Sequence, residues 1–169
     1  MNDESDKKSD KKSEKLKVYI LCGPPGSGKS TWSKEFIKDA PLTRRVCPDE
    51  FRAKLGWGEG DQSVSHLAFQ ASYNALRHYL SLGLNVIVDA TNMHCKGRKE
   101  FINIAREFDA YVVAMVFELD KETLLQRVQK RVSEGGRNIP EDVIDSMLEK
   151  YQRPVKPEFD QVIFQQNKL

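Results

Sequence analysis

A glycine-rich stretch, residues 23–30 with the sequence GPPGSGKS, directly follows the apolar run Val18 to Cys22. It matches the pattern GxxxxGKS/T, in which glycines let backbone N–H groups turn inward around a phosphate. A stretch of helical character up to about Asp39 comes next, so the motif has the strand, loop and helix context that it requires. The positive end of that helix would face the same anion. The motif therefore predicts a nucleoside triphosphate site.

Each residue of this loop has an expected role. Lys29 should reach the β and γ phosphates, and the Ser30 hydroxyl should hold Mg²⁺, with Mn²⁺ as an alternative ion. Thr31 either contacts the α phosphate or faces its own helix, and Trp32 is expected to pack rather than stack on a ligand. A turn that merely starts a helix is the alternative interpretation. The residues expected around ATP or another nucleoside triphosphate are Gly23, Pro24, Pro25, Gly26, Ser27, Gly28, Lys29, Ser30 and Thr31.

Short β-rich runs alternate with stretches of helical periodicity from Lys17 onward. This alternation predicts an α/β fold with a parallel sheet of four to five strands covered by helices on both faces. Taken together with the phosphate-loop motif, the expected fold is the P-loop kinase fold. The expected strands are Val18–Cys22, Arg44–Cys47, Asn85–Asp89, Tyr111–Phe117 and Val162–Phe164. The expected helices are residues 29–39, Asp49–Leu55, Ser63–Leu82, Gly97–Glu107, Lys121–Val132 and Pro140–Tyr151.

Composition narrows the class of protein. With 169 residues, of which 39% are hydrophobic, the chain is expected to form one domain over residues 16–169, after a disordered polar tail over residues 1–15. A formal net charge of +2 neither requires nor excludes a nucleic-acid partner. No apolar run approaches the roughly 20 residues that a membrane span needs, so no membrane association is expected. Three cysteines without a CxxC pair disfavour a disulfide framework and a structural zinc site, which predicts a reducing, cytoplasmic location.

The second expected strand runs into Pro48-Asp49-Glu50-Phe51-Arg52. Carboxyl ends of parallel strands are where open α/β folds bind ligands, so Asp49 is a candidate general base for an attacking hydroxyl. Capping of the following helix is its alternative role. Arg52 shares a helical face with Asp49 and is a candidate for gripping a phosphate on the acceptor, unless it is an ordinary surface arginine.

The third expected strand ends in Asp89-Ala-Thr-Asn92. Asp89 is expected either to orient the magnesium shell, as Asp49 could also do through water, or to pair with an arginine across the cleft; loop capping is the alternative. Thr91 and Asn92 are further candidates for contacts to the acceptor. The isolated His94 and Cys95 lack metal-ligand spacing and are expected to be structural.

A lid should cover the triphosphate and exclude water. Arg127 and Arg131 are four residues apart on one face of an expected helix and could neutralise charge on the transferring phosphoryl group. A solvated basic face is the alternative. The stretch 133–138, SEGGRN, has the composition of a hinged loop and adds Arg137 as a secondary candidate.

Together, GPPGSGKSTW, PDEFR, VDATN, the two lid arginines and the closing YQRPVKPEF resemble the kinase domain of the polynucleotide 5′-hydroxyl kinase family, over nearly all of residues 17–165. By resemblance, Asp49 is the general base and Arg52 contacts the phosphate 3′ to the reacting nucleotide. The resemblance also matches Asp89 to Asn92 with a family segment, and Arg127 and Arg131 with two phosphate-binding lid arginines.

The resemblance implies ATP-dependent transfer to the 5′-OH end of RNA or DNA in nucleic-acid repair. The chain shows no DxDGT-like phosphatase motif, so it is expected to act as a stand-alone kinase with a possible ligase partner in trans. A small-molecule kinase acting on a sugar, nucleoside or antibiotic hydroxyl is one alternative function, and a nucleotide-binding adaptor without transfer activity is another. Trp57 is either a platform for base stacking or a hydrophobic plug.

Overall fold

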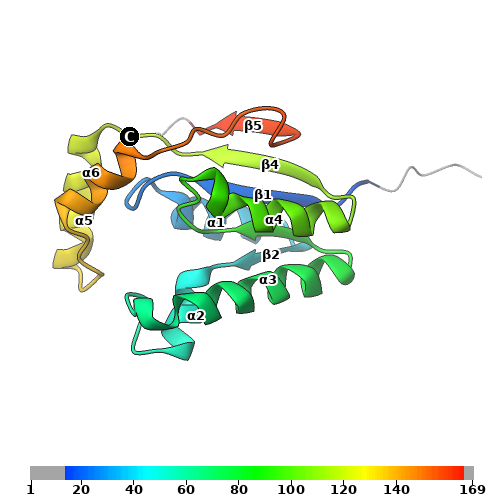
Figure 1. Cartoon of the computed structure of the whole chain (residues 1–169), viewed down its shortest axis with the longest axis horizontal. Coiled ribbons are helices and arrows are strands. Elements are labelled where there is room, and N and C mark those ends of the chain that lie inside the picture. The colour runs from blue at the N-terminus through cyan, green and yellow to red at the C-terminus, as the bar shows by residue number, and fades with distance from the viewer. Residues whose placement is uncertain (1–13, 166–169) are drawn as a thin grey trace, which may run out of the picture.

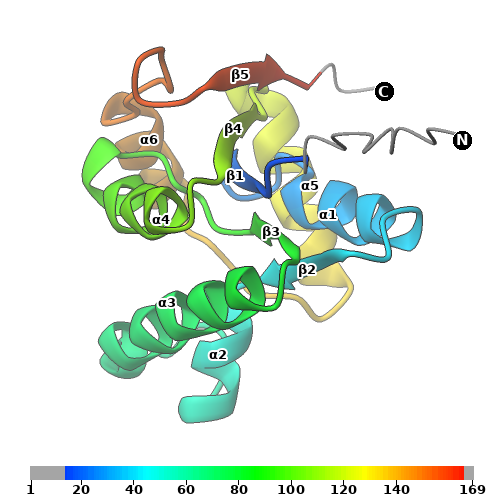
Figure 2. The same cartoon turned by 90° about the vertical axis from the view of Figure 1, so that its right-hand side faces the viewer.

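The computed structural model describes residues 14–165, and these form a five-stranded parallel sheet flanked by helices (Figures 1 and 2). The strands are β1 (Lys17–Cys22), β2 (Thr43–Val46), β3 (Asn85–Val88), β4 (Tyr111–Val116) and β5 (Gln161–Phe164), in the order β2-β3-β1-β4-β5. All four pairings are parallel. The α/β class and the strand number are as predicted. The expected tail lies almost wholly outside the described residues.

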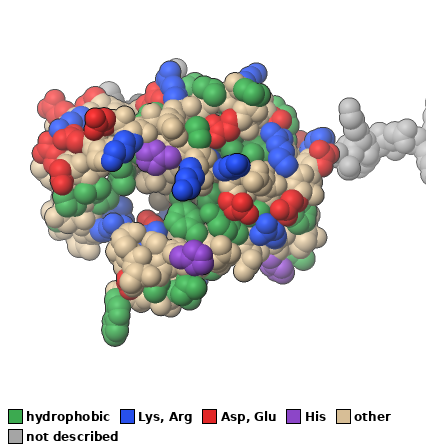
Figure 3. Space-filling model, viewed as in Figure 1, with side chains coloured by type: hydrophobic (Ala, Val, Ile, Leu, Met, Phe, Trp, Pro, Cys, Tyr) green, Lys and Arg blue, Asp and Glu red, His purple; other side chains and the backbone are tan. Residues whose placement is uncertain are grey.

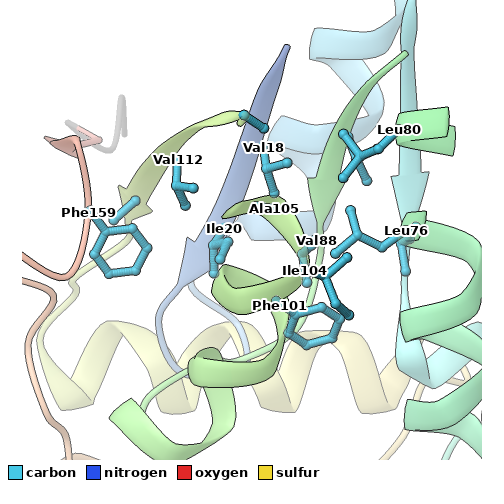
Figure 4. Close-up of a cluster of buried hydrophobic side chains, with 14 of the residues drawn as sticks. Val18, Ile20, Leu76, Leu80, Val88, Phe101, Ile104, Ala105, Val112 and Phe159 are labelled. Carbon is cyan, nitrogen blue, oxygen red and sulfur yellow. The ribbon is translucent and has the colours of Figure 1, made fainter. Parts of the chain in front are cut away.

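One face of the sheet packs against two helices, α3 (Ser65–Ser81) and α4 (Cys95–Glu107). Successive strand residues point to opposite faces, so Val18 and Ile20 of β1 share this side, and Figure 4 shows them beside helix residues of the same core. The buried helix residues of this core include Leu76, Leu80, Phe101, Ile104 and Ala105.

The other face packs against α1 (Lys29–Lys38), which begins inside the glycine-rich loop. Leu21 of β1 points this way, and Trp32 stacks near Phe36 with ring centroids 4.9 Å apart. The predicted packing role of Trp32 is therefore confirmed. Because α1 is anchored on this face, its first turn is fixed at the carboxyl end of β1.

The remaining helices lie towards the carboxyl ends of the strands, where the ribbons of α5 (Lys121–Ser133), α6 (Glu141–Glu149) and α2 (Pro48–Leu55) gather in Figure 1. The chain reaches β3 and β2 on one side of β1, and β4 and β5 on the other. Such a reversal of strand order marks the usual ligand position in open α/β sheets. No helix among residues 14–165 is both long and apolar enough to cross a bilayer.

Several predicted boundaries were wrong by one or two residues, and the causes are local. Pro48 starts α2 as its first residue, so β2 ends at Val46 rather than Cys47. The helix expected from Ser63 begins as a short 3₁₀ turn, η1 (Gln62–Val64), because the Asp61 side chain accepts a hydrogen bond from the Ser63 N–H. Two other helices also differ from the prediction: α4 starts two residues earlier than expected, and α6 is shorter at both ends.

Arg98 on α4 is a fully buried charge that the sequence analysis did not identify. Its guanidinium forms two hydrogen bonds of 2.8 Å to the Glu158 carboxylate. It also donates to the carbonyl oxygens of Asn92, at 2.9 Å, and Gln152, at 2.8 Å. Arg98 thus ties the closing segment of the chain to the loop after β3.

Arg98→Ala should lower the free energy of unfolding by about 3 to 5 kcal/mol, because it leaves a carboxylate and two carbonyl oxygens without their donor. Urea denaturation followed by circular dichroism measures this change. The matched control is Arg77→Ala, which removes an exposed ion pair with Glu107 and should cost less than about 1 kcal/mol. Equal losses in the two variants would contradict a structural role for Arg98.

Candidate active site

A cleft of about 820 Å³ opens where the glycine-rich loop, α2, α5 and α6 meet. Seven lysine and arginine residues and four acidic residues line it, so the cleft carries an excess of positive charge suited to an anionic ligand. The basic residues are Lys29, Lys34, Arg45, Arg52, Arg127, Arg131 and Arg137; the acidic residues are Asp49, Glu50, Glu59 and Asp89.

The glycine-rich loop takes a conformation that larger residues would disturb. A side chain at Gly23 would place its Cβ 2.4 Å from the Phe117 carbonyl oxygen, and Gly28 has a φ of 95° in the left-handed region. The Gly23 N–H donates to the Thr91 carbonyl oxygen at 2.9 Å. The loop is therefore held against the ends of both neighbouring strands.

Lys29 is almost completely buried at the base of the cleft. Its ammonium group donates to the Pro24 carbonyl oxygen at 2.7 Å and lies 3.3 Å from the Ser27 hydroxyl. Burial lowers the pKa of Lys29 to about 8, and the negative charge of Asp89 only partly opposes that effect. Because this buried ammonium group is held mainly by neutral oxygens, a bound phosphate would stabilise its charge.

Ser30 is exposed in the cleft, one residue after Lys29. Mg²⁺ usually takes one or two protein oxygens and completes its shell with water and substrate phosphates. The Ser30 hydroxyl, facing the space beside Lys29, fits that requirement, and the half-exposed Asp49 carboxylate offers a second oxygen ligand through water.

Asp89 is engaged by protein partners. Its Oδ2 accepts hydrogen bonds from the Ser33 hydroxyl, at 3.0 Å, and from Nε of Arg45, at 2.7 Å. The prediction of an arginine partner is confirmed, although that arginine comes from the adjacent strand β2 rather than from across the cleft. Both partners therefore act on the same oxygen, Oδ2, and fix the orientation of this carboxylate.

Arg45 was missed by the sequence analysis, yet it lines the cleft and is paired in the sheet with Ile87. It contacts Glu50 as well as Asp89, and its side chain is only 11% exposed. A charged residue inside a strand that should be covered on both faces was the available signal.

Asp49 and Arg52 lie together on the opposite wall of the cleft. The Arg52 guanidinium pairs with the Asp49 carboxylate and also donates to the Glu59 carbonyl oxygen at 2.8 Å and the Ser65 hydroxyl at 3.1 Å. Arg52 is 5% exposed, so the surface-arginine alternative is wrong. Cys47 is the N-cap residue of α2, so Asp49 is not the cap. The Asp49 side chain is 51% exposed and accessible from the cleft.

The residues after Asp89 divide into two groups. Thr91 lines the cleft, as expected for a ligand contact. Asn92 is buried, has a φ of 45°, and donates from its side-chain amide to the Leu21 carbonyl oxygen at 2.8 Å, so the structure gives it a role in the turn rather than in the cleft. His94 stands at the N-cap position of α4, but its exposed side chain makes no capping hydrogen bond. The Cys95 sulfur accepts a hydrogen bond from Arg98 at 3.1 Å, which agrees with a structural role for Cys95.

The expected lid is built from α5 and the segment that follows it. A Cβ added at Gly26 would lie 3.3 Å from Val128, so α5 packs directly on the phosphate loop. Arg127 and Arg131 both line the cleft, and Arg131 forms an ion pair of 3.5 Å with Glu59 of the opposite wall. Arg137 also lines the cleft. The two lid arginines therefore face the ligand space, in agreement with the functional interpretation of their spacing.

The affinity for ATP should fall as the pH rises above 8, because deprotonation of Lys29 removes the charge that meets the phosphates. Below pH 8 the lysine is charged and binding is at its strongest. Above it, the apparent Kd should rise about tenfold per pH unit until the pKa of the bound state is reached. The terminal phosphate, with a pKa of about 6, is already ionised throughout.

Isothermal titration calorimetry of the Mg²⁺–ATP complex between pH 7 and 9.5 measures this dependence. In Lys29→Arg the guanidinium does not titrate in this range, so any ATP binding that remains should no longer depend on pH. A constant Kd over this range in the unmodified protein would show that Lys29 does not meet the phosphates.

Comparison with known proteins agrees with this geometry. The sequence pattern of the AAA_33 family, described as an AAA domain, matches residues 18–154. L-seryl-tRNA(Sec) kinase of Methanococcus maripaludis is 32% identical over 145 residues, which cover 81% of this chain and 53% of that protein. The bifunctional polynucleotide phosphatase/kinase of Schizosaccharomyces pombe is 27% identical over 149 residues, covering 88% of this chain and 33% of that protein.

Among solved structures, a chain of the Pnkp1/Rnl/Hen1 RNA repair complex superposes with a TM-score of 0.74 at 29% identity. The match covers 81% of this chain and 44% of that one. The chain thus spans about half, or less, of the length of the relatives that it matches. The matched family pattern covers most of the chain and includes the phosphate loop and both lid arginines, so the chain belongs to the AAA_33 family of AAA domains and has a P-loop kinase fold.

Proposed function

We propose that this chain is the kinase domain of a polynucleotide 5′-hydroxyl kinase, which transfers the γ-phosphoryl group of a nucleoside triphosphate to the 5′-OH end of RNA or DNA. The observation that carries the proposal is the Asp49–Arg52 pair on the wall opposite the phosphate loop. The Asp49 carboxylate suits the hydroxyl of an acceptor, and the buried Arg52 guanidinium beside it suits a phosphate on the same acceptor.

The donor half of the site is formed by Lys29, Ser30 and the lid. Lys29 contacts the β and γ phosphates, while Arg127 and Arg131 approach the transferring group from α5. The Ser30 hydroxyl would hold Mg²⁺, which supplies neutralisation of phosphate charge when bound. The lid excludes water, so that the acceptor hydroxyl rather than water receives the phosphoryl group.

Asp49 acts as the general base at the acceptor half. Its carboxylate takes the proton of the attacking 5′-hydroxyl, and the new O–P bond forms at the γ phosphorus. The bond from that phosphorus to the β–γ bridging oxygen breaks, which releases the nucleoside diphosphate. The Arg52 guanidinium pairs with this carboxylate and so holds it on the acceptor side of the cleft.

Arg52 provides selectivity for polynucleotides. A buried guanidinium that still borders the cleft can bind an acceptor phosphate strongly, because its remaining partners hold it in a fixed orientation. A sugar or nucleoside hydroxyl offers no such phosphate. Two relatives also act, by their names, on tRNA and on polynucleotides, and a third belongs to an RNA repair complex.

One alternative has an observation in its favour. The similarity to L-seryl-tRNA(Sec) kinase supports a kinase for a hydroxyl carried on RNA at a place other than the 5′ end. A repair kinase that adds a 5′ phosphate prepares an end for joining, so a ligase acting in trans is the partner that fits the first function. A small-molecule acceptor and a non-transferring adaptor are the other outcomes that the following assay distinguishes.

Transfer of label from γ-labelled ATP should occur to 5′-OH oligonucleotides and to nucleoside 3′-phosphates, and poorly to nucleosides that lack the 3′ phosphate. Separate reactions with RNA, DNA and uncharged or seryl-loaded tRNA compare the acceptors. Label confined to seryl-tRNA would favour the alternative. Label only on small molecules, or turnover of ATP that no hydroxyl compound changes, would overturn a polynucleotide kinase.

Asp49→Asn should leave the Kd for ATP unchanged and reduce kcat by roughly 10²- to 10⁴-fold, because the amide cannot accept the proton. Arg52→Lys should selectively raise KM for acceptors with a 3′ phosphate. The ratio of kcat/KM with and without that phosphate is the informative measurement, since a general folding defect lowers both values together. Near-normal turnover by Asp49→Asn would refute its role as the base.

A further inference from the structure

The loop between α2 and η1, residues 56–61, carries a tryptophan that none of residues 14–165 covers. Trp57 is 100% exposed, whereas Trp32 packs against the sheet. Figure 3 shows hydrophobic side chains projecting from the part of the surface where Figure 1 places α2. A large aromatic side chain left wholly in water is typical of a contact surface, so the hydrophobic-plug interpretation of Trp57 is wrong.

The backbone that presents this side chain is fixed by hydrogen bonds. The Trp57 N–H donates to Oδ2 of Asp61 at 3.0 Å, and the other carboxylate oxygen of Asp61 accepts from the Ser63 N–H at 3.0 Å. The Gly56 N–H donates to the Arg52 carbonyl oxygen at 2.9 Å. A ring held on an ordered loop can stack at a lower entropic cost than a ring on a mobile segment.

The same loop forms part of the acceptor wall. The Glu59 carbonyl oxygen accepts from the Arg52 guanidinium, and Glu59 lines the cleft. Trp57 is two residues from Glu59, so their Cα atoms are at most about 7 Å apart. The backbone of Trp57 therefore lies close to the place where the proposed function puts the phosphate of the acceptor.

A further cation lies beside this loop. Arg137, from the lid segment, lines the cleft, and its Nε lies 3.6 Å from where a Cβ on Gly60 would be. A strand that leaves Arg52 along the loop would thus meet a guanidinium for its backbone and an aromatic ring for its bases. This pairing of cation and ring is typical of sites for single-stranded nucleic acid.

The sequence around the ring favours a nucleic acid over a protein partner. Trp57 is flanked by Gly56 and Gly58 and followed by Glu59, so the loop adds no second large apolar side chain to it. Protein interfaces need a continuous apolar centre, whereas a single base needs only one accessible flat ring.

We propose that Trp57 stacks on a base of the single-stranded acceptor, 3′ of the nucleotide that receives the phosphate, and that Arg137 contacts the intervening backbone. This inference rests on the proposed function and extends it. It makes the acceptor a strand of several nucleotides, bound along the loop 56–61, rather than one terminal nucleotide.

Trp57→Ala should lower kcat/KM for a 5′-OH hexanucleotide roughly tenfold, within the range for loss of one stacked base. It should leave kcat/KM for a nucleoside 3′-phosphate and the Kd for ATP unchanged, because neither ligand carries a base 3′ of the phosphate that meets Arg52. Trp57→Phe should retain most of the activity on the hexanucleotide. Leu67→Ala, which removes another exposed apolar side chain, is the matched control and should change nothing.

Tryptophan fluorescence tests the contact itself. The chain has two tryptophans, so quenching by the unlabelled hexanucleotide that is present in the unmodified protein and lost in Trp57→Phe assigns the stacked ring to Trp57. Unchanged quenching and unchanged kinetics in the Trp57 variants would overturn the inference and leave a protein partner as the reason for the exposed ring.

These results are separable from the proposed function. Equal kcat/KM for the hexanucleotide and the nucleoside 3′-phosphate in the unmodified protein would refute strand binding and leave the kinase assignment intact. Quenching at Trp57 without any label transfer would support the strand site and refute the kinase assignment. Neither quenching nor transfer would refute both.

Discussion

The buried ammonium group of Lys29 is the point on which the rest of the site depends. A charge removed from water at the end of β1 is tolerated because the loop turns the Pro24 carbonyl oxygen towards it and Asp89 lies near enough to act on it. The Asp89 carboxylate is in turn balanced by Arg45, which also contacts Glu50 beside Asp49. A chain of alternating charges, Lys29, Asp89, Arg45 and Glu50, thus runs from the phosphate loop to α2.

The sheet beneath this chain of charges explains why it forms where it does. The phosphate loop, Asp89 and α2 each follow directly on a strand, and the parallel register brings those three strand ends to one edge. The helices on the two faces of the sheet pack against the strands. Arg98 links the chain at Gln152 to the loop after β3, since it donates to the carbonyl oxygens of Gln152 and Asn92. The site therefore stands on the ends of neighbouring strands, with α5 packed on the phosphate loop through the buried Val128 and the loop 56–61 joined to Arg52 through the Glu59 carbonyl oxygen.

Much of this arrangement could be predicted from the sequence, for identifiable reasons. The strand and helix alternation is periodic, and the phosphate loop has a motif whose glycines serve a defined backbone geometry, so both were found. Asp49 was predicted because it follows a strand at the carboxyl edge of the sheet, and Arg52 because it shares a helical face with Asp49. Arg45 and Arg98 were missed because their partners, Asp89 and Glu158, are distant in sequence and no local pattern encodes such pairing. Asn92 was assigned to the cleft because a turn residue and a ligand residue look alike until the backbone φ is known.

The contact between Arg131 and Glu59 has a consequence for how the substrates assemble. Both side chains are about half exposed, so the pair contributes little and yields readily to a phosphate, which carries more charge. Glu59 thus holds the Arg131 guanidinium in a direction that points across the cleft. Glu59 also belongs to the loop whose carbonyl oxygen accepts from Arg52. Under the proposed function, a triphosphate that replaced Glu59 at Arg131 would therefore release a side chain next to Arg52, which would couple binding of the donor to the wall that receives the acceptor.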